Sequence, residues 1–207
     1  HSNGDATCLA DGTKTAVCDR CGIATDTLPD QGSRLSPSMK WNFPAVLHMK
    51  KGQTTGKGKV WGLARGDEIK MWKSDHPQIV SVQKKTGRLS AKKIGKAHIS
   101  VTLKSGYSRS FVVQVQKKPV KTKKLEASEK RLTLKAGSRT KLSASVRPFT
   151  SQEKLKYRSS DCRVVTVSAL GVVTARKKGK ATILIRSGSQ KTRVTVTVTA
   201  AGKTQKR

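Results

Sequence analysis

The sequence predicts an all-β fold: two antiparallel β-sandwiches in tandem, preceded by a small cysteine-rich module. Three observations support this prediction. Apolar and polar residues alternate over many short runs, which is the period of a half-buried strand. A long segment of the chain occurs twice, and the balance of charge changes abruptly near residue 37. The repeat indicates two similar domains, and the change in charge separates a third part from them.

The change in charge marks the first domain boundary. Residues 1–37 contain three Lys or Arg against five Asp or Glu, whereas residues 38–207 contain 41 against seven. Gly, Ser and Pro also cluster at this point, in the stretch "GSRLSPS". We therefore predict a cysteine-rich module over residues 1–37, a first sandwich over 38–117, and a second over 118–207 that ends in a basic tail.

The internal repeat defines the two larger domains. The stretch "GVVTARKKGKATILI" (171–185) matches "GRLSAKKIGKAHISV" (87–101) in pattern, position by position. The match continues on both sides, where "MWKSDHPQIVSV" (71–82) aligns with "KYRSSDCRVVTV" (156–167), and "SGYSRSFVVQV" (105–115) with "SGSQKTRVTVTV" (187–198). A period of this size is typical of whole small domains and not of solenoid units.

The second repeat contains seven short alternating runs separated by Gly, Ser and Pro signals. They are "RLTLKAG", "KLSASVRP", "KLKYRSS", "VVTVS", "GVVTARKKG", "KATILIR" and "TRVTVTVT". Such a series predicts an antiparallel sandwich with one wet face per sheet. In the last run, Val194, Val196 and Val198 should point inward, while Thr195 and Thr197 face solvent. Only 4% of residues are aromatic, so the cores must consist mainly of Val, Ile and Leu.

The first repeat has runs in the corresponding places: "EIKMWKSD", "IVSVQ", "KAHISVTLK" and "SRSFVVQVQ". Trp72 and Tyr157 occupy equivalent positions before a Ser-rich turn, where a large ring is most simply a core anchor. We expect eleven residues of the two repeats to be mostly buried. These are Trp72, Ile79, Val82, Ile99, Val101, Tyr157, Val165, Val167, Ile183, Val196 and Val198.

The order of these residues over about 40–199 resembles the bacterial immunoglobulin-like domain, group 2, in tandem. The most specific part is the segment "G-x-x-T/S-A-(basic)-G-K-A-T/H-I". The resemblance implies immunoglobulin-like β-sandwiches without the disulfide of antibody domains. It also implies stalk, adhesion or accessory modules of surface-exposed or secreted bacterial proteins. The first repeat departs from the family pattern at Pro77 and in its long opening segment.

Two motifs invite functional interpretations. The basic stretches "RKKGK" and "KKIGK" either form lysine-rich turns, in which Gly179 and Gly95 supply backbone freedom, or grip a phosphate. We favour the turn. Arg65-Gly66-Asp67 resembles the integrin-recognition tripeptide, but a short motif without its confirming context is a weak signal. We expect a glycine turn that leads into the strand of "EIKMW".

No arrangement of residues predicts catalysis. The stretch "KKGQTTGKGK" lacks the glycine spacing of a phosphate-binding loop, and the repeats contain neither Gly-x-Ser-x-Gly nor His-Glu-x-x-His. Cys162 aligns with Pro77 in a variable loop, and His98 aligns with Thr182 inside a strand, where it should face solvent. We therefore predict no catalytic residues and a chain that is not an enzyme.

The N-terminal segment predicts a structural zinc site. Cys8, Cys18 and Cys21 form a C-x9-C-x2-C pattern that resembles a short cysteine-containing repeat of Firmicute surface proteins, with Ser33 in place of its closing His. A C-x2-C pair lets two thiolates converge on one ion. This segment has few apolar residues to bury, so its fold needs a metal ion or a disulfide to stabilise it. We predict zinc bound by Cys8, Cys18 and Cys21, with His1 as fourth ligand. The alternative is a disulfide between Cys8 and Cys18 or Cys21.

The charge predicts the kind of partner. A net charge of +32 favours contact with polyanions such as anionic cell-wall polymers, acidic glycans or nucleic acid. We expect a non-catalytic stalk, adhesion or accessory region of a secreted or cell-surface bacterial protein, which binds anionic wall polymers or glycans weakly and salt-dependently. Host surface molecules are further candidate partners.

Two other functions remain open at this point: a nucleic-acid-binding protein that uses its basic surface, and an accessory region of a cell-wall or glycan hydrolase. Against specific nucleic-acid binding, the basic residues are interleaved along every strand and are not gathered on one face, and few aromatic residues are present to stack on nucleobases. No apolar run approaches the roughly 20 residues of a membrane-spanning helix, so we expect no membrane insertion. The resemblance to domains of surface-exposed or secreted bacterial proteins implies an extracellular or cell-surface location. We expect the isolated chain to be a monomer.

Overall fold

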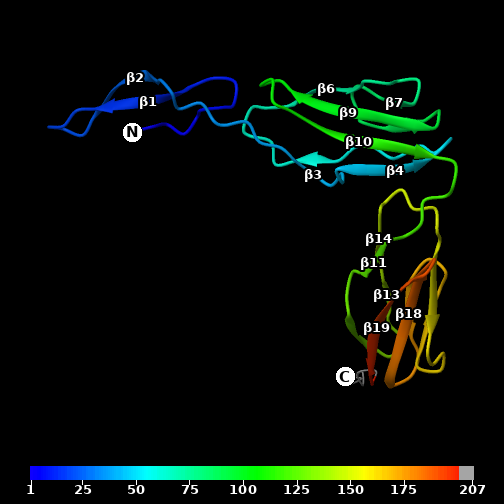
Figure 1. Cartoon of the computed structure of the whole chain (residues 1–207). Coiled ribbons are helices and arrows are strands. Elements are labelled where there is room, and N and C mark those ends of the chain that lie inside the picture. The colour runs from blue at the N-terminus through cyan, green and yellow to red at the C-terminus, as the bar shows by residue number, and fades with distance from the viewer. Residues whose placement is uncertain (201–207) are drawn as a thin grey trace, which may run out of the picture. The chain divides into compact units, whose positions relative to one another are not determined.

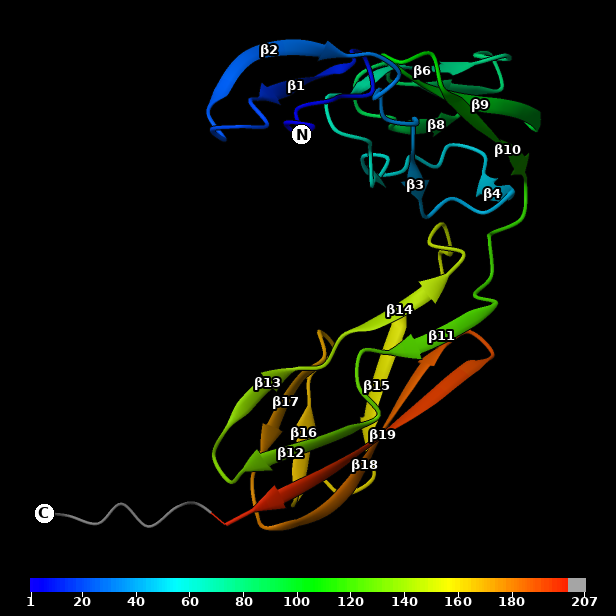
Figure 2. The ribbon, with the colours of Figure 1, turned by 90° about the vertical axis from the view of Figure 1, so that its left-hand side faces the viewer.

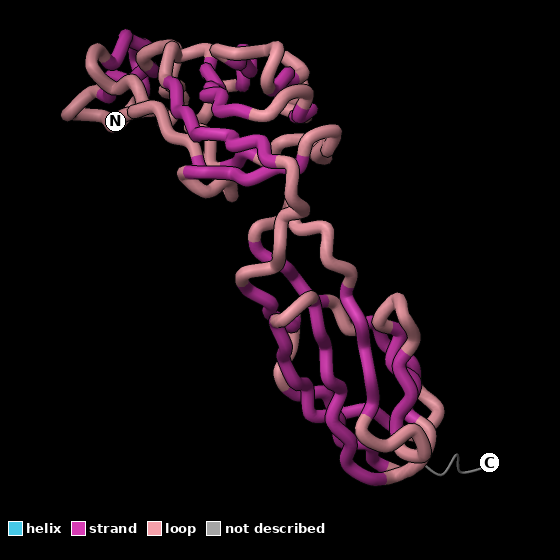
Figure 3. The backbone as a smooth tube through the Cα atoms, turned by 45° about the vertical axis from the view of Figure 1, so that its right-hand side comes forward, coloured by secondary structure: helices cyan, strands magenta, loops and turns pink. Residues whose placement is uncertain are grey.

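The computed structural model describes residues 1–200, except for the side chain of Thr25, and the predicted basic tail over 201–207 lies outside the described residues. The regular structure of residues 1–200 consists of β-strands, which confirms the all-β fold class (Figure 3). No helix able to cross a membrane occurs in this range. The chain forms two compact units, His1–Lys117 and Lys118–Arg207, so the cysteine-rich module belongs to the first unit.

The first unit contains a hairpin and a four-stranded sheet (Figure 1). The hairpin pairs β1 (Gly12–Val17) with β2 (Ala24–Asp30) in the cysteine-rich module. The sheet has the order β4-β10-β9-β6. Its strands are β4 (Val46–Lys50), β6 (Ile69–Ser74), β9 (Gly95–Leu103) and β10 (Ser108–Gln116). Two short pairs complete the unit, β3 (Lys40–Trp41) with β5 (Val60–Trp61) and β7 (Val80–Val82) with β8 (Leu89–Ala91).

The second unit is a sandwich whose larger sheet has the order β12-β19-β18-β15 (Figure 2). Its strands are β12 (Arg131–Lys135), β15 (Leu155–Ser159), β18 (Gly179–Ser187) and β19 (Gln190–Thr199). A smaller sheet has the order β13-β17-β16, formed by β13 (Arg139–Lys141), β16 (Val165–Val167) and β17 (Val172–Ala175). A further pair joins β11 (Lys124–Ala127) to β14 (Ala144–Arg147).

The two larger sheets have the same order and the same strand directions. In each sheet the first strand in the chain lies parallel to the last, β4 beside β10 and β12 beside β19, while the other pairs are antiparallel. The prediction of antiparallel sandwiches therefore needs one correction, a single parallel pair in each larger sheet. Alternation of apolar residues has the same period in both kinds of pairing, so the sequence pattern does not distinguish them.

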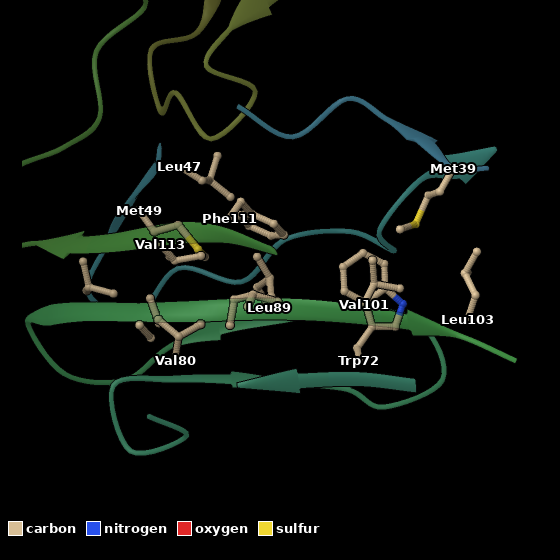
Figure 4. Packing of buried hydrophobic residues seen from close by; sticks show 14 residues of the cluster. Met39, Leu47, Met49, Trp72, Val80, Leu89, Val101, Leu103, Phe111 and Val113 are labelled. Atoms are coloured by element: carbon tan, nitrogen blue, oxygen red, sulfur yellow. The ribbon is translucent and has the colours of Figure 1, made fainter. Parts of the chain in front are cut away.

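The core of the first unit is built around Trp72, which is 1% exposed. Figure 4 shows Trp72 beside Val101 of β9 within the buried cluster. The ring of Phe43 meets the Trp72 ring edge-on, with centroids 5.8 Å apart. Gly87 has a φ of 66°, and a Cβ added there would lie 2.5 Å from Cε2 of Trp72. Glycine is thus required at this position by both backbone conformation and space.

The predicted core is largely confirmed. Seven of the eleven residues are buried: Trp72, Ile99, Val101, Val165, Ile183, Val196 and Val198. The other four, Ile79, Val82, Tyr157 and Val167, are half-buried and pack against the edges of the two clusters. On β19, Val194, Val196 and Val198 point inward and Thr195 is exposed, as predicted, whereas Thr197 is half-buried. The two units therefore each have a hydrophobic core of their own.

Candidate functional site

Cys18 and Cys21 lie in the turn that joins β1 to β2. The amide of Cys18 donates to the carbonyl of Ile23 at 3.0 Å, and the amide of Gly22 donates to the carbonyl of Cys18 at 2.8 Å. Gly22 has a φ of 69°, a conformation that favours glycine. The backbone N–H of Cys21 lowers the pKa of the Cys18 thiol, as do, to a smaller extent, the Cys21 side chain and the N–H of Arg20. This turn thus favours a thiolate at Cys18.

Cys8 lies in a different environment. It is 4% exposed, its amide donates to the carbonyl of Arg65 at 2.8 Å, and its Sγ donates to Oδ2 of Asp67 at 3.5 Å. Burial raises the pKa of this thiol, and the neighbouring carboxylate of Asp67 adds to the rise. Cys8 therefore favours the neutral thiol, and it joins the cysteine-rich module to the loop before β6.

The structure does not gather the predicted zinc ligands. Nowhere in residues 1–200 do three or more His, Cys, Asp or Glu side chains form a group that could hold a metal ion. His1 is exposed, and its amino group donates to the carbonyl of Thr15. All four cysteines are free thiols in this structure, and the disulfide stays the alternative to zinc. The structure brings together Cys18 and Cys21 of the predicted set, and zinc binding stays a prediction.

The integrin-like tripeptide is an internal contact. Asp67 is 6% exposed, and its carboxylate accepts hydrogen bonds from the Ser105 hydroxyl at 2.7 Å and the Ser105 amide at 3.1 Å. Arg65 donates to the carbonyl of Gly4. Gly66 has a φ of 80°, and a Cβ there would lie 2.8 Å from Cβ of Thr7. The tripeptide therefore forms the predicted turn and packs the cysteine-rich module against the first sandwich.

The basic stretches "KKIGK" and "RKKGK" form the turns before β9 and β18, which confirms the turn interpretation. Gly95 and Gly179 begin these strands with φ values of 148° and 156°. A Cβ would lie 2.9 Å from the Ile79 side chain at Gly95 and 3.0 Å from the Val164 side chain at Gly179. Both glycines are therefore fixed by conformation and close packing, without any need for a ligand.

Two histidines of the first unit share one carboxylate. Oδ1 of Asp75 lies 2.9 Å from Nδ1 of His76, and Oδ2 lies 3.0 Å from Nδ1 of His98. Desolvation alone would raise the pKa of Asp75, but hydrogen bonds from His76 and His98 outweigh it and lower the pKa to about 2. The His98 side chain is 63% exposed on β9, as predicted from the sequence. Oδ1 of Asp75 also accepts a hydrogen bond from the His98 amide at 2.7 Å. In the second unit, the Ser160 hydroxyl accepts the equivalent hydrogen bond from the Thr182 amide.

The larger sheet of the second unit carries a strongly basic outer face. Its four strands contain eight Lys or Arg and no Asp or Glu, and all eight are exposed. They are Arg131, Lys135, Lys156, Arg158, Lys180, Arg186, Lys191 and Arg193. A surface depression of about 410 Å³ on this face is lined by Arg158, Ser159, Ser160, Thr182, Leu184 and Arg193. A second basic depression, of about 660 Å³, lies on the first unit among Lys50, Lys51, Lys92 and Lys117.

We expected the Lys and Arg residues to be interleaved along the strands and not gathered on one face. For this sheet the second part of that expectation is wrong. Alternate positions of one strand lie on the same side of a sheet, so bases interleaved with apolar residues must collect on its outer face. The sequence contained this signal in the runs "KLKYRSS", "KATILIR" and "TRVTVTVT". Only the pairing of β15, β18 and β19 shows that the Lys and Arg side chains of these strands are neighbours.

Residues 119–198 match the family model of the bacterial Ig-like domain (group 2). The second unit, whose sandwich spans these residues, is thus a domain of this family. The first unit shares the strand order and strand directions of the larger sheet with it. The predicted relation of the cysteine-rich module to Firmicute surface repeats stays a prediction. No curated protein matches the sequence of the chain.

Several solved structures are similar to the chain at low identity. Domains 4 and 5 of the S-layer protein SbsC share 19% identity with a TM-score of 0.37, over 62% of this chain and 75% of that one. Domains 1–6 of SbsC share 15% identity with a TM-score of 0.38, over 92% of this chain and 32% of that one. Drosophila N-cadherin EC1-3 shares 11% identity with a TM-score of 0.36, over 78% and 66%. The chain thus spans about a third of the six-domain SbsC structure that it resembles.

Proposed function

We propose that the chain is a non-catalytic region of a secreted or cell-surface bacterial protein, serving as a stalk, adhesion or accessory segment that binds anionic wall polymers or glycans. The membership of residues 119–198 in the bacterial Ig-like family supports the class of protein. The tandem of two separately packed units supports the role as a stalk or adhesion segment.

The excess of unpaired positive charge carries the binding part of the proposal. Residues 38–207 contain 41 Lys or Arg but only seven Asp or Glu, so most of these bases have no carboxylate available within the two sandwiches. An exposed base without a partner attracts external anions, and each contact releases counterions from a polyanion. Binding should therefore be weak at physiological salt, broad in specificity and steeply dependent on ionic strength.

The surroundings of the histidines support a non-catalytic role. His76 and His98 both direct Nδ1 at Asp75, and in the described part of the chain neither ring is hydrogen-bonded to a Ser, Thr or Cys side chain. A hydrolase of the serine or cysteine type needs such a nucleophile next to its base. The His76–Asp75–His98 contact is better explained as an anchor that holds the C-terminal end of β6 against β9.

The test is to measure binding of the full chain to poly(glycerol phosphate), heparin and duplex DNA from 50 to about 300 mM salt. All three should bind at low salt and lose affinity steeply, because the interaction depends on counterion release. Absence of binding to every polyanion at 50 mM salt would refute the proposal. A single DNA sequence bound far more tightly than other DNA at about 150 mM salt would favour the nucleic-acid alternative instead.

A further inference from the structure

We propose that the outer face of the larger sheet in the second unit is the main polymer-binding surface, and that it takes a linear polyol phosphate of the teichoic-acid type. The inference rests on the proposed function and deepens it, because it names one surface and one polymer chemistry. We call this surface the basic face. It consists of Lys156, Arg158, Arg186, Lys191 and Arg193, together with Leu184.

The basic face is organised in two rows across three strands. In one row Lys156 of β15 pairs with Arg186 of β18, which pairs with Lys191 of β19. In the next row, Arg158 pairs with Leu184, and Leu184 with Arg193. Neighbouring strands lie about 5 Å apart, and alternate residues of one strand recur about every 7 Å. The rows thus present five positive charges as a regular two-dimensional array.

The ion pairs of the described residues do not include this array. None of the five basic side chains forms an ion pair with an Asp or Glu of residues 1–200. The nearest carboxylate in sequence to β15 on its C-terminal side, Asp161, is engaged by Arg163. Like charges directly opposite each other destabilise a sheet, so the row Lys156–Arg186–Lys191 opposes folding.

The first unit shows that the fold does not require these charges. Its equivalent rows are Met71–Thr102–Ser108 and Lys73–Ser100–Ser110, which contain a single base. The same sheet order and strand directions therefore form with neutral residues at four of the five positions. A charged array that the fold neither needs nor neutralises is explained by an external anion that binds to it.

The side chains of the basic face indicate the chemistry of that anion. Arginine presents a planar fork of donors that matches a phosphate group, and a regular array of bases suits a polymer with regularly repeated phosphates. The four strands contain one aromatic residue, Tyr157, which packs against the core and not on the outer face. The face therefore offers no aromatic side chain on which nucleic-acid bases could stack.

The depression between the two arginines suits the uncharged part of such a polymer. Leu184 is half-buried at the centre of the row, and the hydroxyl-bearing residues Thr182 and Ser160 line the same depression. An apolar side chain between two guanidinium groups can contact the carbon chain of a polyol, while the threonine and serine can hydrogen-bond its hydroxyl groups. A phosphate–polyol–phosphate unit thus fits the order base, apolar centre, base.

The decisive variant transfers residues of the first unit into the second. Lys191→Ser with Arg193→Ser gives β19 the residues that β10 carries as Ser108 and Ser110. The matched control is Arg139→Ser with Lys141→Ser, which also removes one Lys and one Arg two positions apart. These two residues are exposed on β13, in the other sheet of the same unit. Each variant loses two positive charges, so the two variants have equal net charge and differ in the sheet from which the charge is removed.

The probe is poly(glycerol phosphate) of defined length, titrated against the full chain at several salt concentrations. We expect the β19 variant to bind at least about tenfold more weakly and to reduce the slope of log affinity against log salt by about 1.5. The β13 control should stay within about twofold of the unsubstituted chain. The charge-preserving variant Lys191→Arg with Arg193→Lys should restore most of the binding, which separates loss of charge from misfolding.

Two results would overturn the inference, and the first of them would leave the proposed function intact. Equal losses in the β19 and β13 variants would mean that binding is spread over the surface and is not located on the basic face. A single-stranded oligonucleotide with the same number of phosphates, bound more tightly than poly(glycerol phosphate) and lost in the β19 variant, would replace the polyol phosphate by nucleic acid. Failure of the unsubstituted chain to bind any polyanion would instead refute the proposed function.

Discussion

Replacing Trp72 by Ala should destabilise the first unit severely and leave the second unchanged. Trp72 is 1% exposed and packs against Phe43, Gly58 and Gly87. Truncating a buried aromatic residue to Ala costs about 3–5 kcal/mol, because burial is lost and a cavity remains. A small domain has a total stability of roughly 5–15 kcal/mol, so the first unit would lose a large part of it.

Tryptophan fluorescence can follow the first unit alone. The three tryptophans, Trp41, Trp61 and Trp72, all lie in His1–Lys117. In the variant, Trp41 remains as a reporter of the core, because its ring packs edge-on against the buried Phe111 with ring centroids 5.5 Å apart. With a urea m-value of about 1.5 kcal/mol/M, the fluorescence midpoint should fall by about 2–3 M. Circular dichroism should record an unchanged second transition, because the second unit has a separate core.

A loss of stability under about 1 kcal/mol would refute the claim that Trp72 anchors the core. A shift of both transitions together would refute the claim that the two cores are separate. The control is Trp61→Ala, which removes a 49% exposed tryptophan from the same unit and should change the midpoint little.

Three further predictions concern charge, pH and metal. Lys191→Ser with Arg193→Ser should raise the melting temperature at low salt by relieving like-charge repulsion, and the gain should vanish in about 1 M salt, where the charges are screened. The folded pKa of Asp75 is about 2, below its ordinary value of 3.8, so its stabilising contacts persist above about pH 4 and are lost as the pH falls towards 2. Thermal melts should therefore show a smaller loss between pH 7 and pH 3 for Asp75→Asn than for the unsubstituted chain; an equal loss contradicts this. Elemental analysis of protein purified without chelator should find one zinc per chain, lost in Cys18→Ser; no metal together with two unreactive cysteines would establish a disulfide instead.

The positions of the strands were predictable because alternation is a local property of the sequence. The run "SRSFVVQVQ" is β10 over Ser108–Gln116, and "KATILIR" lies within β18 over Gly179–Ser187. The strand β13 (Arg139–Lys141) was not predicted, because its three residues, Arg, Thr and Lys, include no apolar residue and so show no alternation. The direction of β4 and β12 relative to their neighbours was also hidden, because parallel and antiparallel pairs share one period.

The candidate sites divide in the same way. The close pair Cys18 and Cys21 followed from their spacing, because two residues three apart stay together in one turn. The environment of Cys8 did not, since its partner Asp67 is far away in the sequence and reaches it only through the packing of the module on the first sandwich. The sequence did not show whether the integrin-like tripeptide is accessible. In the structure the Asp67 carboxylate is buried and accepts hydrogen bonds from Ser105, a residue of the turn after β9.

The sequence by itself determined the fold class, the repeat and the excess of positive charge, because composition and local periodicity are independent of how strands pair. Only the tertiary structure decided where that charge is concentrated. Lys156, Arg186 and Lys191 come from three separate runs, and the register of β15, β18 and β19 makes them direct neighbours. Register depends on contacts between residues distant in the chain, which no local pattern contains.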